Sequence, residues 1–175
     1  MKKNDLLRYE DKVIRVLRIQ EDKVLVIDLV KCTMPVWMNP ADLCTYVSYA
    51  EELFYSDMNF EVVDEVHIHS KDKEIMYQRY AMVTAILPFV TDEKMRSVAI
   101  SKVTEQYEVS KQSVRSYLCR YLAFNHIQSL LPQKKSDDRE LTQDERNIRW
   151  SLNRFFYNKN RNSLKTAYTL MLKEK

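Results

Sequence analysis

The chain contains no glycine among its 175 residues, and this absence constrains its fold more than any other feature. Glycine adopts positive φ at no steric cost and lets a backbone approach a phosphate closely. Because phosphate-cradling loops and dinucleotide fingerprints depend on these properties, nucleotide-dependent catalysis of those types is disfavoured. Tight turns must instead use Asn, Asp, Ser or strained residues, which favours a helix-rich chain over a meandering β fold.

The positive charge of the chain is concentrated in its later part. Residues 1–70 hold eight basic and 13 acidic side chains, residues 71–135 hold 11 and six, and residues 136–175 hold nine and six. An acidic first part and a basic remainder indicate different tasks, because only the basic part would attract a polyanion. With 45% apolar residues, the chain can bury a substantial core.

The first part of the chain is predicted to be β-rich. Residues 12–19 and 23–30 are rich in β-branched side chains and are separated by three polar residues, which predicts a hairpin. Together with residues 6–10 and 34–38 they give three or four short strands. We therefore expect a small barrel or curled sheet within residues 1–70.

The helical period begins after this segment. Residues 72–87 and 91–107 carry apolar side chains at helical spacing, and Thr91 is a candidate cap for the second of these helices. We expect a helical domain over residues 71–131, followed by a polar linker over residues 132–140.

The clearest functional feature is an acid-free stretch, residues 109–136, that carries five basic side chains. It overlaps a pattern typical of helix, tight turn and helix over residues 103–122, in which Ser110 is placed to cap the second helix. Val114, Leu118, Tyr121 and Leu122 would form the inward stripe of that helix. The opposite face is predicted to present to solvent Lys111, Gln112, Arg115, Ser116, Cys119 and Arg120.

Residues 103–122 match the helix-turn-helix pattern in part. Val109, Ser110 and Val114 fit, whereas Thr104 stands where alanine is usual and Glu108 stands where glycine is usual. A non-glycine residue in the left-handed conformation costs on the order of 1 kcal/mol, which a packed domain tolerates. The alternative is a plain helical hairpin with a solvated basic face.

A second helical unit is expected over residues 141–175. Thr142 and Glu145 form a capping box ahead of one helix, and Ser163 is placed to cap a second helix after a polar turn. A polar loop before an ordinary amphipathic helix is the alternative to a second DNA-binding surface. The candidate DNA-binding residues of both units are Ser110, Lys111, Gln112, Ser113, Arg115, Ser116, Arg120, Arg161, Asn162, Ser163 and Lys165.

No cofactor, metal or catalytic residue is expected in this chain. The three cysteines have no CxxC spacing, and the pair His67 and His69 lacks further ligands. The carboxylate pairs Glu51–Glu52 and Asp137–Asp138 are interpreted as solvating charge, and the aromatic side chains Trp37, Trp150, Phe155 and Phe156 as core. Without a signal peptide or a membrane-length apolar run, a reduced cytoplasmic location is expected.

The order of these segments resembles the N-terminal DNA-binding region of DDE transposases of the phage Mu type, within the retroviral integrase-like superfamily. The most similar pieces are ILPFVTDEKMRSVAISKV at residues 86–103 and NSLKTAYTLML at residues 162–172. The resemblance implies a mainly α fold with a small β-rich N-terminal domain and tandem helix-turn-helix-like domains, the second of them truncated. It also implies recognition of double-stranded transposon ends, association with other transposase protomers and a nucleoid-associated bacterial protein.

In the resembling family, Mg²⁺-dependent strand transfer is carried out by a following ribonuclease H-like domain with three separated carboxylates. That domain is not expected within these residues, so the chain would bind DNA without performing the chemistry. Two rival functions stay open: a standalone helix-turn-helix transcriptional regulator with residues 1–70 as its dimerisation or ligand domain, and a protein-interaction module whose basic helices dock an acidic partner.

Overall fold

A computed structural model describes residues 1–132, 142–157 and 163–174. The chain divides into two compact units, Met1–Pro132 and Gln133–Lys175. Of the predicted linker at residues 132–140, Pro132 is described and residues 133–140 lie outside the described residues. Within the described ranges, no helix is long and apolar enough to cross a membrane.

The first unit begins with a five-stranded antiparallel sheet in the order β4-β3-β2-β1-β5. The predicted hairpin is present as β2 and β3, with a register shift between Val16 and Arg18. A single-turn 3-10 helix, Pro40–Leu43, covers the face that carries Val16 and Val26. The strands are β1 Leu6–Tyr9, β2 Lys12–Ile19, β3 Val24–Asp28, β4 Val36–Met38 and β5 Val47–Tyr49.

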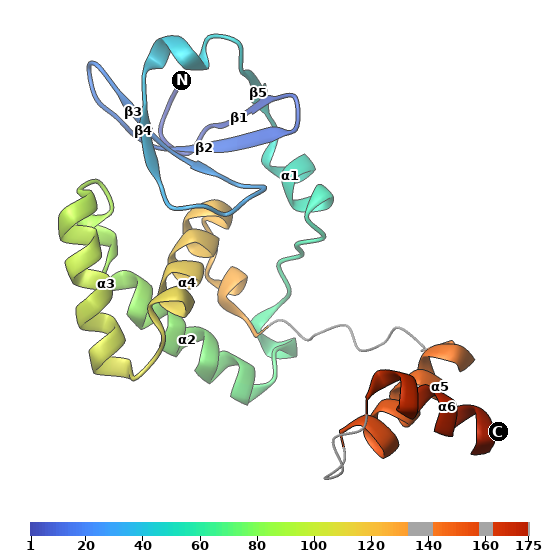
Figure 1. The fold of residues 1–175 in the computed structure, drawn as a ribbon. Helices are drawn as coiled ribbons and strands as arrows, with labels where there is room; N and C mark the ends of the chain where they lie inside the picture. The colour runs from blue at the N-terminus through green and yellow to red at the C-terminus, as the bar shows by residue number, and fades with distance from the viewer. Residues whose placement is uncertain (133–141, 158–162, 175) are drawn as a thin grey trace. The chain divides into compact units, whose positions relative to one another are not determined.

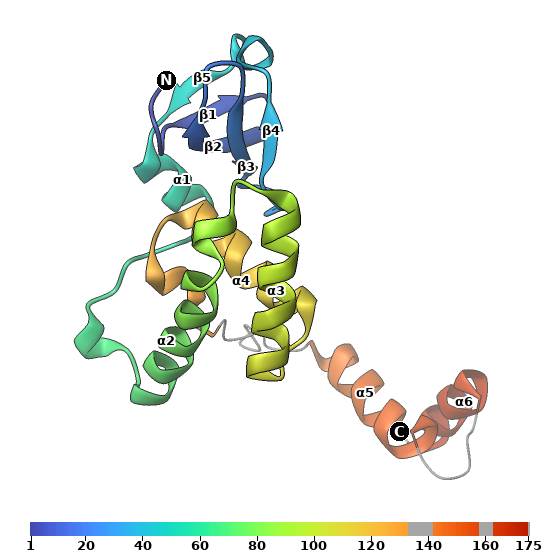
Figure 2. The same cartoon turned by 90° about the vertical axis from the view of Figure 1, so that its left-hand side faces the viewer.

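Helices occupy the rest of this unit, beside the sheet (Figures 1 and 2). The short helix α1 follows the last strand, and the three longer helices pack together around buried Met76, Ile100 and Leu118. The helices are α1 Glu51–Asp57, α2 Ser70–Thr84, α3 Glu93–Tyr107 and α4 Lys111–Phe124.

The predicted helix boundaries need correction at α3 and at α2. Asp92, not Thr91, caps α3, because its carboxylate accepts a hydrogen bond from the Met95 amide at 2.9 Å. Asp and Thr are both favourable N-cap residues, so two adjacent candidates do not show at which of them the helix begins. The helix predicted over residues 72–87 spans Ser70–Thr84, and a separate 3-10 turn, Leu87–Phe89, contains Pro88.

The sheet and the helices share their cores, so the predicted division between residues 70 and 71 lies inside one compact unit. Leu25 of β3 packs with the helical core, and Ala123 of α4 packs with the sheet core. The Arg15 side chain, which is 1% exposed, donates from Nε to the Ala123 carbonyl at 2.8 Å. A guanidinium at the C-terminus of a helix satisfies a free carbonyl and complements the helix dipole.

The second unit is a pair of helices, α5 Gln143–Ser151 and α6 Leu164–Glu174, with a π-helical turn at Leu152–Phe156 after α5. The predicted capping box is confirmed: the Thr142 amide donates to the Glu145 carboxylate at 2.9 Å, and the reverse bond is 3.3 Å. Ser163 caps α6 by accepting from the Thr166 amide at 3.2 Å.

The core of this second unit is small. Phe155 and Ala167 are buried in it, whereas Trp150 is 38% exposed and therefore not the core residue that the sequence predicted. Trp150 contacts Phe155 edge to face instead, with 5.5 Å between ring centroids. The helical spacing of apolar residues predicted that Trp150 would be buried. In a unit of only two helices, few side chains are available to cover it, so part of the ring is exposed.

Candidate nucleic-acid interface

The turn between α3 and α4 has the geometry that the sequence predicted. Glu108 ends α3 in the left-handed conformation, with φ 52° and ψ 37°. Ser110 then caps α4, accepting a hydrogen bond from the Ser113 amide at 3.1 Å. The three residues between α3 and α4 thus suffice to redirect the chain, and α4 starts with a capped N-terminus.

The inward and outward faces of α4 follow the predicted stripe over its first two turns. Val114 and Leu118 are fully buried against α2 and α3. On the other side Ser113 is half-buried, its hydroxyl 2.9 Å from that of Ser110. The exposed side chains of this end are Lys111, Gln112, Arg115 and Ser116.

Cys119 does not face solvent as predicted. Its side chain is 2% exposed, and its thiol lies 3.4 Å from the Met34 sulfur on the loop between β3 and β4. Burial raises the pKa of Cys119 to about 12. The sheet and its loop thus cover the outward stripe of α4 at Cys119, so the exposed part of that stripe lies in the N-terminal turns.

Arg120 is half-buried rather than fully exposed. Burial lowers the pKa of Arg120, and the neighbouring Cys32 thiol acts in the opposite direction. Arginine nevertheless stays charged at neutral pH. The contact between Arg120 and a DNA phosphate stays a prediction. Arg120 would make this contact from the edge of the exposed surface.

Two other arginines near α4 are held by the fold. Arg96 is 7% exposed and donates to the Val90 carbonyl at 2.7 Å. Arg79 donates to the Leu130 carbonyl at 2.8 Å and stacks on the ring of Tyr117. These side chains contribute positive potential, and one nitrogen of each guanidinium donates a hydrogen bond within the unit.

In the second unit, Ser163 and Lys165 are exposed at the N-terminus of α6. Arg161 and Asn162, predicted to bind DNA from the preceding turn, lie outside the described residues. A capped helix N-terminus with an exposed lysine is a suitable place for a phosphate.

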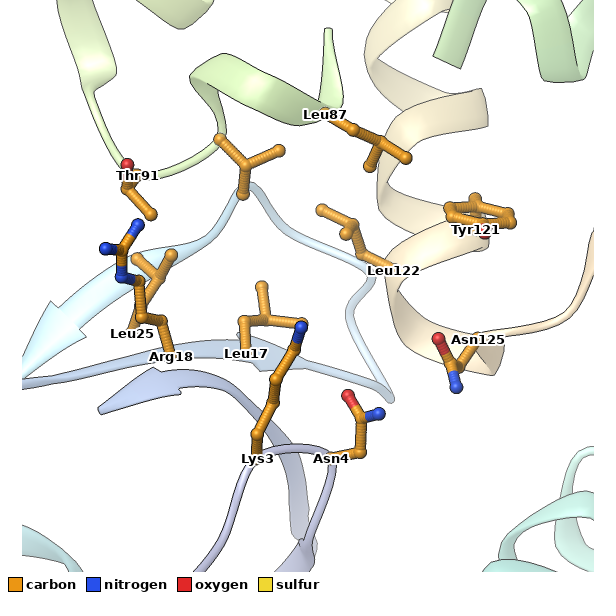
Figure 3. Close-up of a pocket in the computed structure, with 11 residues that line it drawn as sticks. Lys3, Asn4, Leu17, Arg18, Leu25, Leu87, Thr91, Tyr121, Leu122 and Asn125 are labelled. Carbon is orange, nitrogen blue, oxygen red and sulfur yellow. The ribbon is translucent and has the colours of Figure 1, made fainter. Parts of the chain in front are cut away.

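A cavity opens at the other end of α4 from Ser110 (Figure 3). Leu17, Leu25 and Leu122 form apolar parts of its wall, and Lys3 and Arg18 stand at its edge. Residues from the N-terminus, the sheet and α4 meet here, so no local sequence pattern could have predicted it. Its distance along α4 from the exposed N-terminal turns separates it from the proposed DNA surface.

The described residues contain no group of three or more His, Cys, Asp or Glu side chains that could hold a metal ion. His69 instead caps α2, its ring nitrogen accepting from the Lys71 amide at 3.3 Å. Glu51 is not merely a solvating charge as predicted, because it accepts a hydrogen bond from Arg15 at 2.7 Å. Asp137 and Asp138 lie outside the described residues.

A comparison with protein families finds a match within the second unit. Residues 142–175 match the family model described as the TnsB transposase helix-turn-helix domain. This range contains α5, the π-helical turn and α6. No curated protein matches the chain. The match supports the predicted transposase DNA-binding region and the presence of a helix-turn-helix domain at the C-terminal end of the chain.

Proposed function

We propose that this chain recognises specific double-stranded DNA as the end-binding part of a transposase of the phage Mu type. The observation that carries the proposal is the match of residues 142–175 to a transposase helix-turn-helix domain. The exposed, capped N-terminus of α4 supports a second reading unit in the same chain. Two units on one chain raise each other's effective concentration on a long site.

In the first unit, α4 enters the major groove by its N-terminal turns. Gln112 and Arg115 face base edges, since glutamine pairs with adenine and arginine with guanine in bidentate fashion. Lys111 and the amides at the start of α4 lie nearer the phosphates. The second unit presents Ser163 and Lys165 in the same way, with Arg161 and Asn162 as further candidates.

The chemistry of transposition is assigned to another domain of the DDE type, and this chain is proposed to act without a cofactor of its own. Incubating the 175 residues with DNA and Mg²⁺ or Mn²⁺ tests this part. Nicking or joining that a single carboxylate substitution abolishes would overturn it. Association between protomers on DNA follows from the same proposal and is measured by light scattering of the complex.

Fluorescence anisotropy tests the DNA-binding proposal, after a preferred site has been selected from random DNA. Arg115→Ala should cost roughly 1 to 3 kcal/mol on that site and relax the sequence preference. Arg120→Ala should weaken all sequences alike and reduce the salt slope by about one. Lys102→Ala, an exposed cation on α3, is the control and should change neither.

Failure of the parent chain to prefer any sequence would refute specific recognition. Weak binding with no dependence on salt would favour the rival protein-interaction module, because counterion release accompanies every phosphate contact. If Arg115→Ala binds the selected site as well as the parent does while remaining folded, α4 is not the reader, and Arg161, Asn162 and Lys165 become the first candidates.

A further inference from the structure

The loop between β3 and β4 lies beside the exposed end of α4. One hollow is lined by loop residues on one side and by outward residues of α4 on the other. Its lining contains two cations, Lys31 and Arg115, and no acid. The complete lining is Lys31, Cys32, Thr33, Met34, Gln112, Arg115, Ser116 and Cys119.

Internal bonds hold this loop in place. The Lys31 amide donates to the Asp28 carboxylate at 2.8 Å, and the Cys32 thiol donates to the Leu29 carbonyl at 3.3 Å. Cys32 itself adopts positive φ, 46°, where the chain reverses. Met34 fixes the loop to α4 through its contact with Cys119. The loop is thereby preorganised next to the helix, so a ligand that it contacts need not order it first.

The side chains that the loop presents are free to bind. Lys31 and Thr33 are exposed, and no ion pair or side-chain hydrogen bond of either is recorded among the described residues. The burial of Cys119 leaves an exposed stripe from Lys111 to Ser116, about 9 Å of helix at 1.5 Å per residue. A major groove about 12 Å wide admits such a segment, and the elements that flank it then face the sugar-phosphate backbone.

We propose that the β3–β4 loop is a second DNA-contacting element of the first unit, in which Lys31 binds a backbone phosphate beside the groove that α4 enters. This inference rests on the proposed function of α4. The proposal gives the sheet a role in DNA recognition. The β3–β4 loop limits how far α4 enters the major groove, to the residues before Cys119, and Lys31 adds a phosphate contact that positions the helix without reading bases.

The test is Lys31→Gln in the full chain, measured by anisotropy on the selected site and on random DNA at several salt concentrations. Losing one phosphate contact should flatten the slope of log affinity against log salt by about 0.9 and weaken binding roughly 5- to 10-fold at 0.1 M salt. Both DNAs should be affected equally. Lys31→Arg should restore the parent's affinity and slope, because it restores the charge.

Lys12→Gln is the matched control, since Lys12 is an exposed lysine of the same sheet at the turn between β1 and β2. An equal loss in Lys12→Gln and Lys31→Gln would show an effect of net charge alone and overturn the proposal. Unchanged affinity and slope in Lys31→Gln would overturn it too, while leaving α4 as the reader. Failure of the parent chain to bind specific DNA would instead refute the proposed function.

Discussion

Replacing Glu108 by glycine should stabilise the protein, although glycine within a helix usually destabilises it. Glu108 ends α3 with φ 52° and ψ 37°, and its side chain is exposed. An L-residue in this region costs about 1 to 2 kcal/mol. Glycine removes that cost, but it makes the unfolded chain more flexible, which costs about 0.4 to 1 kcal/mol. The difference between these two ranges is a net gain of about 0 to 1.6 kcal/mol, with its middle at about 0.8 kcal/mol.

This gain should appear in thermal unfolding of the full chain, followed by calorimetry and by circular dichroism. For a protein of this size it corresponds to a rise of about 1 to 4 °C in the transition of the first unit. Glu105→Gly is the matched control, because Glu105 is an exposed residue inside α3. There glycine lacks the benefit of positive φ and should cost about 1 kcal/mol.

The two variants should therefore shift the unfolding temperature in opposite directions. A fall in stability for Glu108→Gly as large as for Glu105→Gly would refute the left-handed assignment and, with it, the turn that aims α4. DNA affinity should remain that of the parent in Glu108→Gly, because the backbone conformation of the turn is retained.

Three further measurements test other parts of the structure. Arg15→Met should lower the free energy of unfolding in urea by about 1.5 to 3 kcal/mol by leaving the Ala123 carbonyl unpaired, and no loss would contradict the role given to Arg15. At pH 8 a maleimide should label the exposed Cys44 long before Cys119, whose raised pKa of about 12 leaves a thiolate fraction on the order of one in ten thousand; equal rates would contradict its burial. Brief trypsin treatment should cut first within residues 133–140, and cutting inside α3 or α4 instead would refute the predicted linker.

Local sequence signals predicted the longer helices, the central strands and several of the helix caps. Ser110 and Thr142 cap the helices that they were expected to cap, and Glu108 adopts the left-handed conformation expected where a turn lacks glycine. These features depend on residues within one helical turn of each other. The chain alone likewise determined the β2–β3 hairpin, because richness in β-branched side chains and a short polar turn are also local signals.

Tertiary structure decided which polar and apolar positions are accessible. Cys119 continues the exposed stripe of α4 in sequence, but Met34, 85 residues away, covers it. Arg15 was one charge among many in the first part of the chain, and its burial depends on the end of α4 at Ala123.

The sequence therefore predicted that the N-terminal end of α4 is an exposed helical surface. It did not predict how far along the helix that exposed surface extends. Helical periodicity says which side of a helix is apolar, and it says nothing about what a distant strand or loop places on the polar side. The loop at Lys31 lies beside Arg115 because the sheet and the helices share one core, and that packing joins residues far apart in the chain. Such contacts follow from the fold as a whole, which short-range patterns do not encode.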